Sequence, residues 1–234
     1  MPHLDFTIDL ETCGLGTCAA PLQLAAVAWQ RTTPLADGSP FLRDIDAIIP
    51  GTTDEHCCIS PTFNAAIDLR DCFFLGLDID ADTQQWWMRQ KPEARLAVLE
   101  ASRPLSLADT LRDFDTWFRA LRTALGADSM TLWAQGSDFD IAKLREYYRR
   151  CGLKEPFAYT EVRCARTYLL EHAHLFADPA EALRAPKTVY DHIPAMPSDI
   201  CQSVTHDALY DCYKTSWSVW QVYQKELGVR SSQP

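Results

Sequence analysis

The stretch LDFTIDLET, residues 4–12, alternates apolar and polar side chains along its whole length. A period of two predicts a β-strand with one apolar face. Asp9 and Glu11 lie two residues apart, so both carboxylates project from the same side of that strand. Neighbouring carboxylates repel each other unless a cation lies between them, and hard divalent cations prefer oxygen ligands. The segment therefore predicts either part of a metal site or a strand with a solvated acidic face.

Length and composition predict one folded domain. The chain has 234 residues, of which 47% are hydrophobic, which is enough for a substantial core. It contains no run of about 18 apolar residues that could cross a membrane. The first five residues lack the basic and apolar regions of a signal peptide. We therefore expect a cytoplasmic protein that does not act in a membrane.

The cysteine and charge patterns argue against a protein stabilised by zinc or disulfides and against one that coats nucleic acid. The nine cysteines are odd in number and include no Cys-x-x-Cys pair, which argues against a zinc site or a disulfide framework. The net charge of −10 argues against tight, non-specific coating of nucleic acid. Residues 137–166, however, carry seven basic and five acidic side chains. Weak and transient binding of nucleic acid is compatible with this distribution.

The first third of the chain predicts an antiparallel meander. Residues 21–29 are apolar and predict a second strand, and the turn signal Asp37-Gly38 leads to a third strand over 41–49. Residues 51–80 show no clear period, and we expect an irregular insertion there.

Later segments predict alternating helices and strands. Asp82 and Gln85 have the spacing of a capping box, and a short helix containing Trp86 should follow. Ser106 opens a long amphipathic helix that ends at Gly126. Residues 130–134 predict a buried strand, and Ser137 should cap the helix after it. The fold class is therefore α/β, in a single domain over residues 1–234.

The end of the chain predicts a loop followed by a long helix. Residues 186–203 contain three prolines and predict a mobile loop. The helix after it should start at His206 or Asp207 and stop at Gly228. His206 lies just outside this helix, where a base could close over a substrate, although a surface histidine is the simpler interpretation. Asp211 lies one turn further on, where no capping role explains it.

Asp140 has two interpretations. It falls in the first turn of its helix, where the helix dipole favours an anion. It could complete an ordinary capping box with Ser137, or it could be a metal ligand, and Asp138 is the nearby competitor for that role.

Three motifs in this order resemble the DEDDh exonucleases of the ribonuclease-H-like superfamily. They are Asp9-x-Glu11, Phe139-Asp140 after a strand, and His206-x4-Asp211. The resemblance spans about residues 4–224. A finer resemblance, to the subgroup that contains phage exodeoxyribonuclease A and bacterial exoribonucleases, rests on three further segments: Trp86-Trp87 with Gln90, Leu132–Gly136 and Arg163–Thr167. Gln135 stands where members of the subgroup often have Asn.

This resemblance implies a ribonuclease-H-like mixed sheet flanked by helices, with the meander followed by parallel strands. It implies a 3′→5′ exonuclease that acts on a 3′ end of single-stranded RNA or DNA, or on an overhang, and releases nucleoside 5′-monophosphates. His206 would be the general base. The four carboxylates expected to hold two Mg²⁺ or Mn²⁺ ions are those of Asp9, Glu11, Asp140 and Asp211. The residues expected to contact substrate are Thr12, Gly14, Leu15, Trp86 and Phe139.

Several alternatives stay open from the sequence. Trp86 and Trp87 are adjacent on a helix, so at most one should face a ligand, and both could be core residues. The basic helix after Asp140 is either a solvated face or a flank that follows nucleic acid. The chain could also be an inactive exonuclease-fold adaptor, or a metal-dependent phosphohydrolase of nucleotides. A homodimer is one assembly to be tested.

Overall fold

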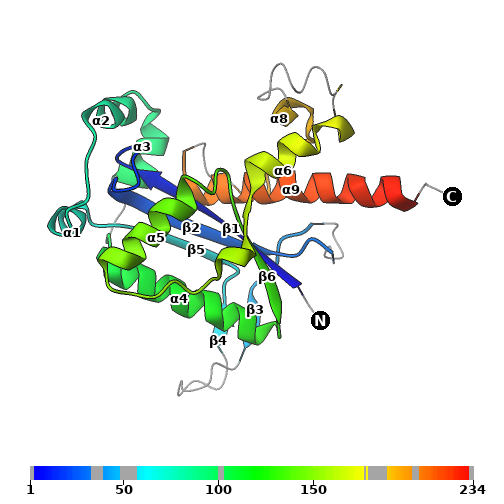
Figure 1. Cartoon of the computed structure of the whole chain (residues 1–234), viewed down its shortest axis with the longest axis horizontal. Coiled ribbons are helices and arrows are strands. Elements are labelled where there is room, and N and C mark those ends of the chain that lie inside the picture. The colour runs from blue at the N-terminus through cyan, green and yellow to red at the C-terminus, as the bar shows by residue number, and fades with distance from the viewer. Residues whose placement is uncertain are drawn as a thin grey trace.

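A five-stranded mixed sheet forms the centre of the molecule (Figure 1). The computed structural model describes residues 3–32, 39–47, 57–99, 103–176, 178, 189–201 and 206–231. The strand order is β5-β2-β1-β6-β7. The strands are β1 (His3–Thr12), β2 (Pro21–Trp29), β5 (Thr62–Ala66), β6 (Ser129–Ala134) and β7 (Val162–Cys164). The pairs β1–β2 and β2–β5 are antiparallel, whereas β1–β6 and β6–β7 are parallel. The predicted α/β class and mixed sheet are confirmed.

Helices cover both faces of the sheet. The helices α4 (Leu107–Ala124) and α5 (Asp140–Arg150) cover one face, and α6 (Ala165–Glu171) and α9 (Ala208–Ser231) cover the other. Phe6 of β1 packs on Phe118 of α4, with ring centroids 4.3 Å apart. The second face of β1 is also covered, because Thr7 accepts hydrogen bonds from Trp29 and from Ser216 of α9. The polar side of the strand is therefore buried rather than solvated.

The third strand of the meander is not the predicted one. In the described part of the expected segment 41–49, residues 45–47 form a strand, β3 (Ile45–Ala47), which pairs with β4 (Cys57–Ile59) in a separate two-stranded sheet. Phe41 makes an isolated bridge with Trp29. The strand that pairs with β2 is β5, which follows further along the chain.

The expected irregular insertion also contains regular structure. Within residues 57–80 the structure has β4, β5 and the helix α1 (Leu69–Phe74), whose N-terminus is capped by Asp68. The absence of a clear period misled the prediction, because these elements are short. Residues 48–56 lie outside the described part of the chain.

The helix starts test the capping predictions. Ser106 caps α4 as predicted, accepting the backbone N–H of Asp109 at 3.1 Å. The helix α2 (Ala81–Met88) is capped by Asp80 rather than Asp82, since the Asp80 carboxylate accepts the N–H of Thr83 at 2.7 Å. The helix α3 (Pro92–Leu99) follows it.

The later helices differ from the prediction at their ends. Phe139 is the N-cap of α5 and makes no side-chain capping bond, so Ser137 is not the cap. The helix α9 continues through Gly228, because glycine weakens a helix without necessarily ending it. The described residues between them also include the short 3₁₀ helices η1 (Tyr159–Glu161) and η2 (Ala173–Leu175) and the helix α8 (Val189–His192). Residues 179–188 lie outside the described residues.

Part of the loop predicted at 186–203 is described, over residues 189–201. Ile193 is buried against Leu169 and Val222. The indole N–H of Trp217 donates to the carbonyl of Pro194 at 2.8 Å. These contacts fix the middle of the segment on α6 and α9, and mobility of 186–203 as a whole stays a prediction. Among the described residues, no helix is both long and apolar enough to span a membrane.

Candidate active site

A cleft of about 1050 Å³ lies at the carboxyl ends of β1 and β6. Ligand sites in sheets with parallel strands commonly lie at this edge. The structure brings all ten predicted site residues to the cleft wall. The five predicted catalytic residues are Asp9, Glu11, Asp140, His206 and Asp211, and the five predicted substrate contacts are Thr12, Gly14, Leu15, Trp86 and Phe139.

The four carboxylates repel one another in a partly dry environment. Burial, followed by the charges of Asp140 and Glu11, raises the pKa of Asp9 well above its usual value. Burial is also the main cause that raises the pKa of Glu11 to about 8 and that of Asp140 to about 7. The pKa of Asp211 is raised by burial as well. The charged forms of these four neighbouring carboxylates are therefore unfavourable without a counter-ion. Such a cluster is suited to binding cations.

Three side chains offer ligand atoms close together. One atom each from Glu11, His206 and Asp211 lies within 4.8 Å of the others. His206 has a φ of 66°, and its backbone N–H donates to the Asp211 carboxylate at 3.3 Å. Oxygen-rich donors with one imidazole fit a divalent metal ion of the magnesium or manganese type.

The helix α2 forms one wall of the cleft. Trp87 is buried, and its indole N–H donates to the carbonyl of Thr12 at 3.1 Å, which fixes α2 to the end of β1. Trp86 lines the cleft and is 39% exposed. Both tryptophans border the cleft, but only Trp86 is substantially exposed there, and contact of its ring with a ligand stays a prediction.

The turn after β1 is shaped for close approach. A Cβ atom on Gly14 would lie 3.1 Å from the Cβ of Ala19, so a larger residue would crowd this turn. The buried ammonium group of Lys143 donates to the carbonyl of Leu15 at 2.9 Å and also to that of Gly16. The Leu15 side chain is 82% exposed at the rim. The loop thus exposes the Leu15 side chain at the cleft, while the hydrogen bonds from Lys143 fix the position of its backbone.

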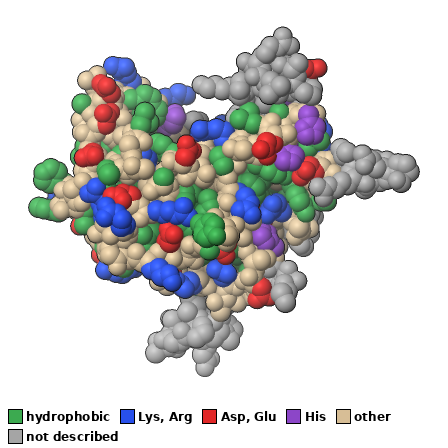
Figure 2. All heavy atoms as spheres, viewed as in Figure 1, with side chains coloured by type: hydrophobic (Ala, Val, Ile, Leu, Met, Phe, Trp, Pro, Cys, Tyr) green, Lys and Arg blue, Asp and Glu red, His purple; other side chains and the backbone are tan. Residues whose placement is uncertain are grey.

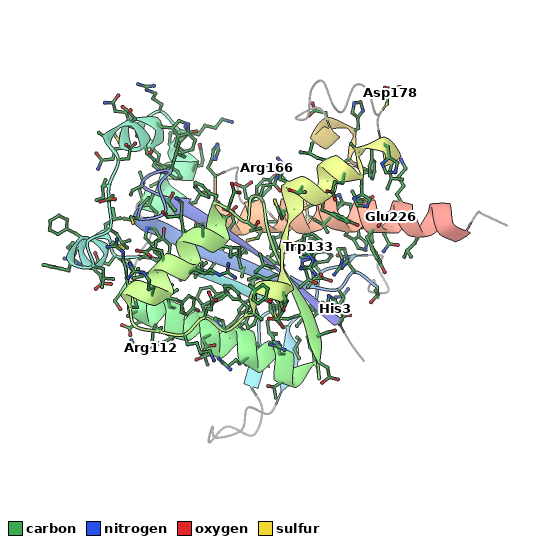
Figure 3. The ribbon with its side chains drawn as sticks, viewed as in Figure 1. His3, Arg112, Trp133, Arg166, Asp178 and Glu226 are labelled. Atoms are coloured by element: carbon green, nitrogen blue, oxygen red, sulfur yellow. The ribbon has the colours of Figure 1, made fainter. Side chains whose placement is uncertain are left out.

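Arg166 is a cleft residue that the sequence reasoning did not assign a role. It projects from the first turn of α6 beside the strand ends (Figure 3), and its positive charge partly offsets the burial that raises the pKa of Asp140. Gly136 has a φ of 151°, and a Cβ there would lie 3.3 Å from the Arg166 guanidinium. The resemblance in segment 163–167 was the one available signal. The opposite wall is acidic, with Asp78, Asp80 and Asp82.

Basic side chains gather over α5 and the neighbouring β7–α6 region in Figure 2, but many are paired. Arg149 and Arg150 both contact the carboxylate of Glu146, at 2.6 and 2.8 Å. Arg145 pairs with Glu155 at 3.2 Å. These ion pairs reduce the positive potential, which favours a solvated face over a strongly attractive flank.

A family model described as 3'-5' exoribonuclease Rv2179c-like domain matches residues 5–223. The chain belongs to this family of 3′-5′ exonucleases. The exodeoxyribonuclease of Enterobacteria phage T4 is 26% identical over 223 residues, covering 90% of this chain and 85% of the phage protein. The predicted resemblance is therefore confirmed.

Solved structures support the same fold. E. coli Exonuclease I in complex with a dA16 oligonucleotide has a TM-score of 0.53 at 13% identity, with 98% of this chain and 42% of that chain covered. The nuclease domain of 3'hExo, a DEDDh family member bound to rAMP, has a TM-score of 0.50 at 14% identity, with 95% and 92% covered. The protein described here thus spans less than half the length of the Exonuclease I chain.

Proposed function

We propose that this exonuclease removes nucleoside 5′-monophosphates one at a time from the 3′ end of single-stranded RNA or DNA, or from a single-stranded overhang. We further propose that Asp9, Glu11, Asp140 and Asp211 hold two Mg²⁺ or Mn²⁺ ions. The observation that carries the proposal is the convergence of these four carboxylates with His206 in one cleft. Their raised pKa values support it, because burial, together with carboxylate repulsion at Asp9 and Glu11, disfavours the anions, and bound cations would offset that cost.

When bound, the ions would supply charge neutralisation at the phosphodiester and activation of the attacking water. His206 would accept a proton from that water through a ring nitrogen, as a general base. Its position just before α9, beside the Asp211 carboxylate, supports this role. Leu15, Trp86 and Phe139 would orient the terminal nucleotide through apolar and stacking contacts.

The proposal is tested with matched RNA and DNA oligonucleotides labelled at either end, in Mg²⁺, Mn²⁺ or EDTA. A 5′ label should give a ladder, a 3′ label should give a mononucleotide, and EDTA should stop both. A 3′-phosphate should block attack, and a circular single strand should stay intact. Endonucleolytic products from the circle would contradict the proposal.

Variants separate the proposal from its alternatives. Asp9→Ala and Asp140→Ala should abolish activity while the fold is retained, and Asp113→Asn, at an exposed position of α4, is the matched control. Activity of Asp9→Ala within tenfold of wild type would sink the assignment. Binding without hydrolysis in the wild type would favour an adaptor, and cleavage of free nucleotides alone would favour a phosphohydrolase.

We also propose that the protein acts in the cytoplasm, where 3′ ends of single strands occur. The assembly to be tested is a homodimer, and light scattering after size-exclusion chromatography distinguishes it from a monomer.

A further inference from the structure

Gln23 is a buried polar residue outside the cleft wall, and it lies directly beside the site. It is 3% exposed and pairs with Glu11 across the antiparallel β1–β2 ladder. Residues opposite each other in such a ladder place their side chains on the same face of the sheet. Gln23 is therefore the neighbour of Glu11 on the face that α9 covers.

The Gln23 amide joins β2 to the start of α9. Its Oε1 accepts the backbone N–H of Ala208 at 3.0 Å. Its Nε2 donates to the Asp207 carboxylate at 3.1 Å and to the side-chain oxygen of Asn64 at 2.9 Å. The partners determine the orientation of the amide, because a flipped group would set its NH₂ against an N–H and its oxygen against two oxygens.

Asp207, the residue directly before α9, completes this junction. The carboxylate oxygen that accepts from Gln23 also accepts the backbone N–H of Leu209, at 3.0 Å. The N–H groups of the first residues of a helix have no partners inside the helix and need them from elsewhere. Gln23 satisfies that of Ala208, and Asp207 satisfies that of Leu209. The start of α9 is thus fixed by two buried side chains, one from the sheet.

The same turn carries two of the proposed site residues. The N–H of Asp211 donates to the carbonyl of Asp207 at 3.1 Å, and the N–H of His206 donates to the Asp211 carboxylate. A shift in the start of α9 would therefore move the His206 and Asp211 side chains away from Glu11. A small displacement of such groups is enough to reduce turnover strongly.

We propose that Gln23 is a positioning residue of the active site, which acts with Asp207 to hold His206 and Asp211 against Glu11. This inference rests on the proposed roles of those three residues. Gln23 itself touches neither substrate nor metal in this assignment. Asp207 contributes through its oxygen acceptor rather than as a metal ligand.

Three variants and a double variant test the assignment. Gln23→Leu removes every polar contact at similar size, Asp207→Ala removes the acceptor, and Asp207→Asn keeps an acceptor oxygen without the charge. The measurements are kcat and KM on a 5′-labelled oligonucleotide, Mn²⁺ affinity by calorimetry, and hydrogen exchange of residues 208–211.

Gln23→Leu should lower kcat and weaken Mn²⁺ binding by about 10–100-fold, the range found for groups that orient metal ligands. KM should change by less than about threefold, because the substrate contacts remain. Exchange at 208–211 should be faster. Asp207→Asn should restore most of the loss seen in Asp207→Ala. The double variant Gln23→Leu/Asp207→Ala should resemble either single variant, because the two residues act through one junction.

Gln224→Leu is the matched control. Gln224 lies near the other end of α9 and donates to the carbonyl of Arg31 at 3.2 Å. This variant should lower thermal stability without changing kcat or Mn²⁺ affinity. If Gln23→Leu does not fold, Gln23→Glu replaces it, since it keeps size and the acceptor for Ala208 but sets a carboxylate against that of Asp207.

Unchanged kcat, Mn²⁺ affinity and exchange in a folded Gln23 variant would overturn the proposal. Loss of Mn²⁺ binding in Asp207→Asn equal to that in Asp207→Ala would also overturn it, because Asp207 would then act as a ligand. If the wild type cleaves no oligonucleotide, the proposed function fails, whereas Mn²⁺ affinity and exchange still test the junction.

Discussion

The indole ring of Trp86 meets the imidazole of His206 edge to face, with ring centroids 4.9 Å apart and an interplanar angle of 84°. Trp87 packs behind Trp86 at 5.0 Å and is itself fixed to the end of β1. The two tryptophans thus form a continuous aromatic connection from the strand of Asp9 to the proposed base. A nucleobase that stacks on Trp86 would contact the same ring as His206. The position of the substrate would thereby be coupled to the position of the proposed general base.

Trp86→Ala should weaken binding of a single-stranded 3′ end by about 1–3 kcal/mol, the range for loss of one stacked base. Trp86→Phe should recover most of the affinity because a ring remains. Fluorescence anisotropy with a labelled oligonucleotide in Ca²⁺ measures binding without turnover. If Trp86→Ala binds as tightly as wild type but turns over slowly, Trp86 acts only through His206 and does not stack a base.

His206→Ala should reduce turnover by about 10²–10⁴-fold, the usual contribution of a general base, with little change in substrate affinity. Mn²⁺ binding should survive, because the four carboxylates remain. Calorimetry is needed beside kinetics, since a ring nitrogen of His206 lies within 4.8 Å of a carboxylate oxygen of both Glu11 and Asp211, close enough for all three to share one metal ion. Loss of Mn²⁺ binding in this variant would make His206 a ligand and require another base.

The proposed catalytic residues could be found from the sequence because each lies in a short local pattern. Asp9 and Glu11 belong to one alternating strand, and Asp140 and Asp211 lie in the first turns of helices. The alternation predicted that the Asp9 and Glu11 carboxylates project to the same side, whereas the interpretation of Asp140 stayed open until the motifs were taken together. The order of the motifs then matched a family, and the structure brings them to one cleft.

Other features depend on contacts between distant segments and left no local pattern. Gln23 and Asp207 are 184 residues apart, and only the packing of α9 on the sheet joins them. The strand β5 was missed because its five residues, Thr62–Ala66, are too few to give a clear period and owe their structure to pairing with β2. Arg166 reaches the cleft because β7 and α6 bring it there, which its sequence neighbours alone do not reveal.

Without metal, the protein should lose stability as pH rises from about 5 to 8. The pKa is about 8 for Glu11 and about 7 for Asp140, whereas both groups have a pKa near ~4 in an unfolded chain. In this window the folded state binds more protons than the unfolded state, so the free energy of unfolding falls with rising pH. Thermal unfolding in EDTA at several pH values measures the effect, and Asp9→Asn should raise the midpoint at pH 8.

The same protons should be released when metal binds. Mn²⁺ affinity should therefore rise with pH until about pH 8, and calorimetry at pH 7 in two buffers of different ionisation enthalpy should show proton release. A metal-free wild type that is more stable at pH 8 than at pH 6, or Mn²⁺ binding without proton release at pH 7, would contradict the coupling between these carboxylates and the metal site.

At the opposite end of β1, Asp5 holds a buried ion pair near His3 and Trp133 (Figure 3). Its fully buried carboxylate contacts the Arg31 guanidinium at 2.9 and 3.0 Å and accepts the indole N–H of Trp133 at 2.8 Å. Asp5→Ala would leave a guanidinium and an N–H without this partner, and should destabilise the fold by about 3–5 kcal/mol.

Urea unfolding measures this loss, and Arg112→Ala, which removes an exposed partner of Asp109, is the control that should leave the midpoint nearly unchanged. Replacing both partners, as in Asp5→Leu/Arg31→Met, should recover much of the stability because no unpaired charge then remains. At temperatures well below unfolding, Asp5→Ala should keep the wild-type kcat, since the pair lies at the far end of the strand from the cleft. An unchanged urea midpoint in Asp5→Ala would mean that water or another side chain replaces the lost carboxylate.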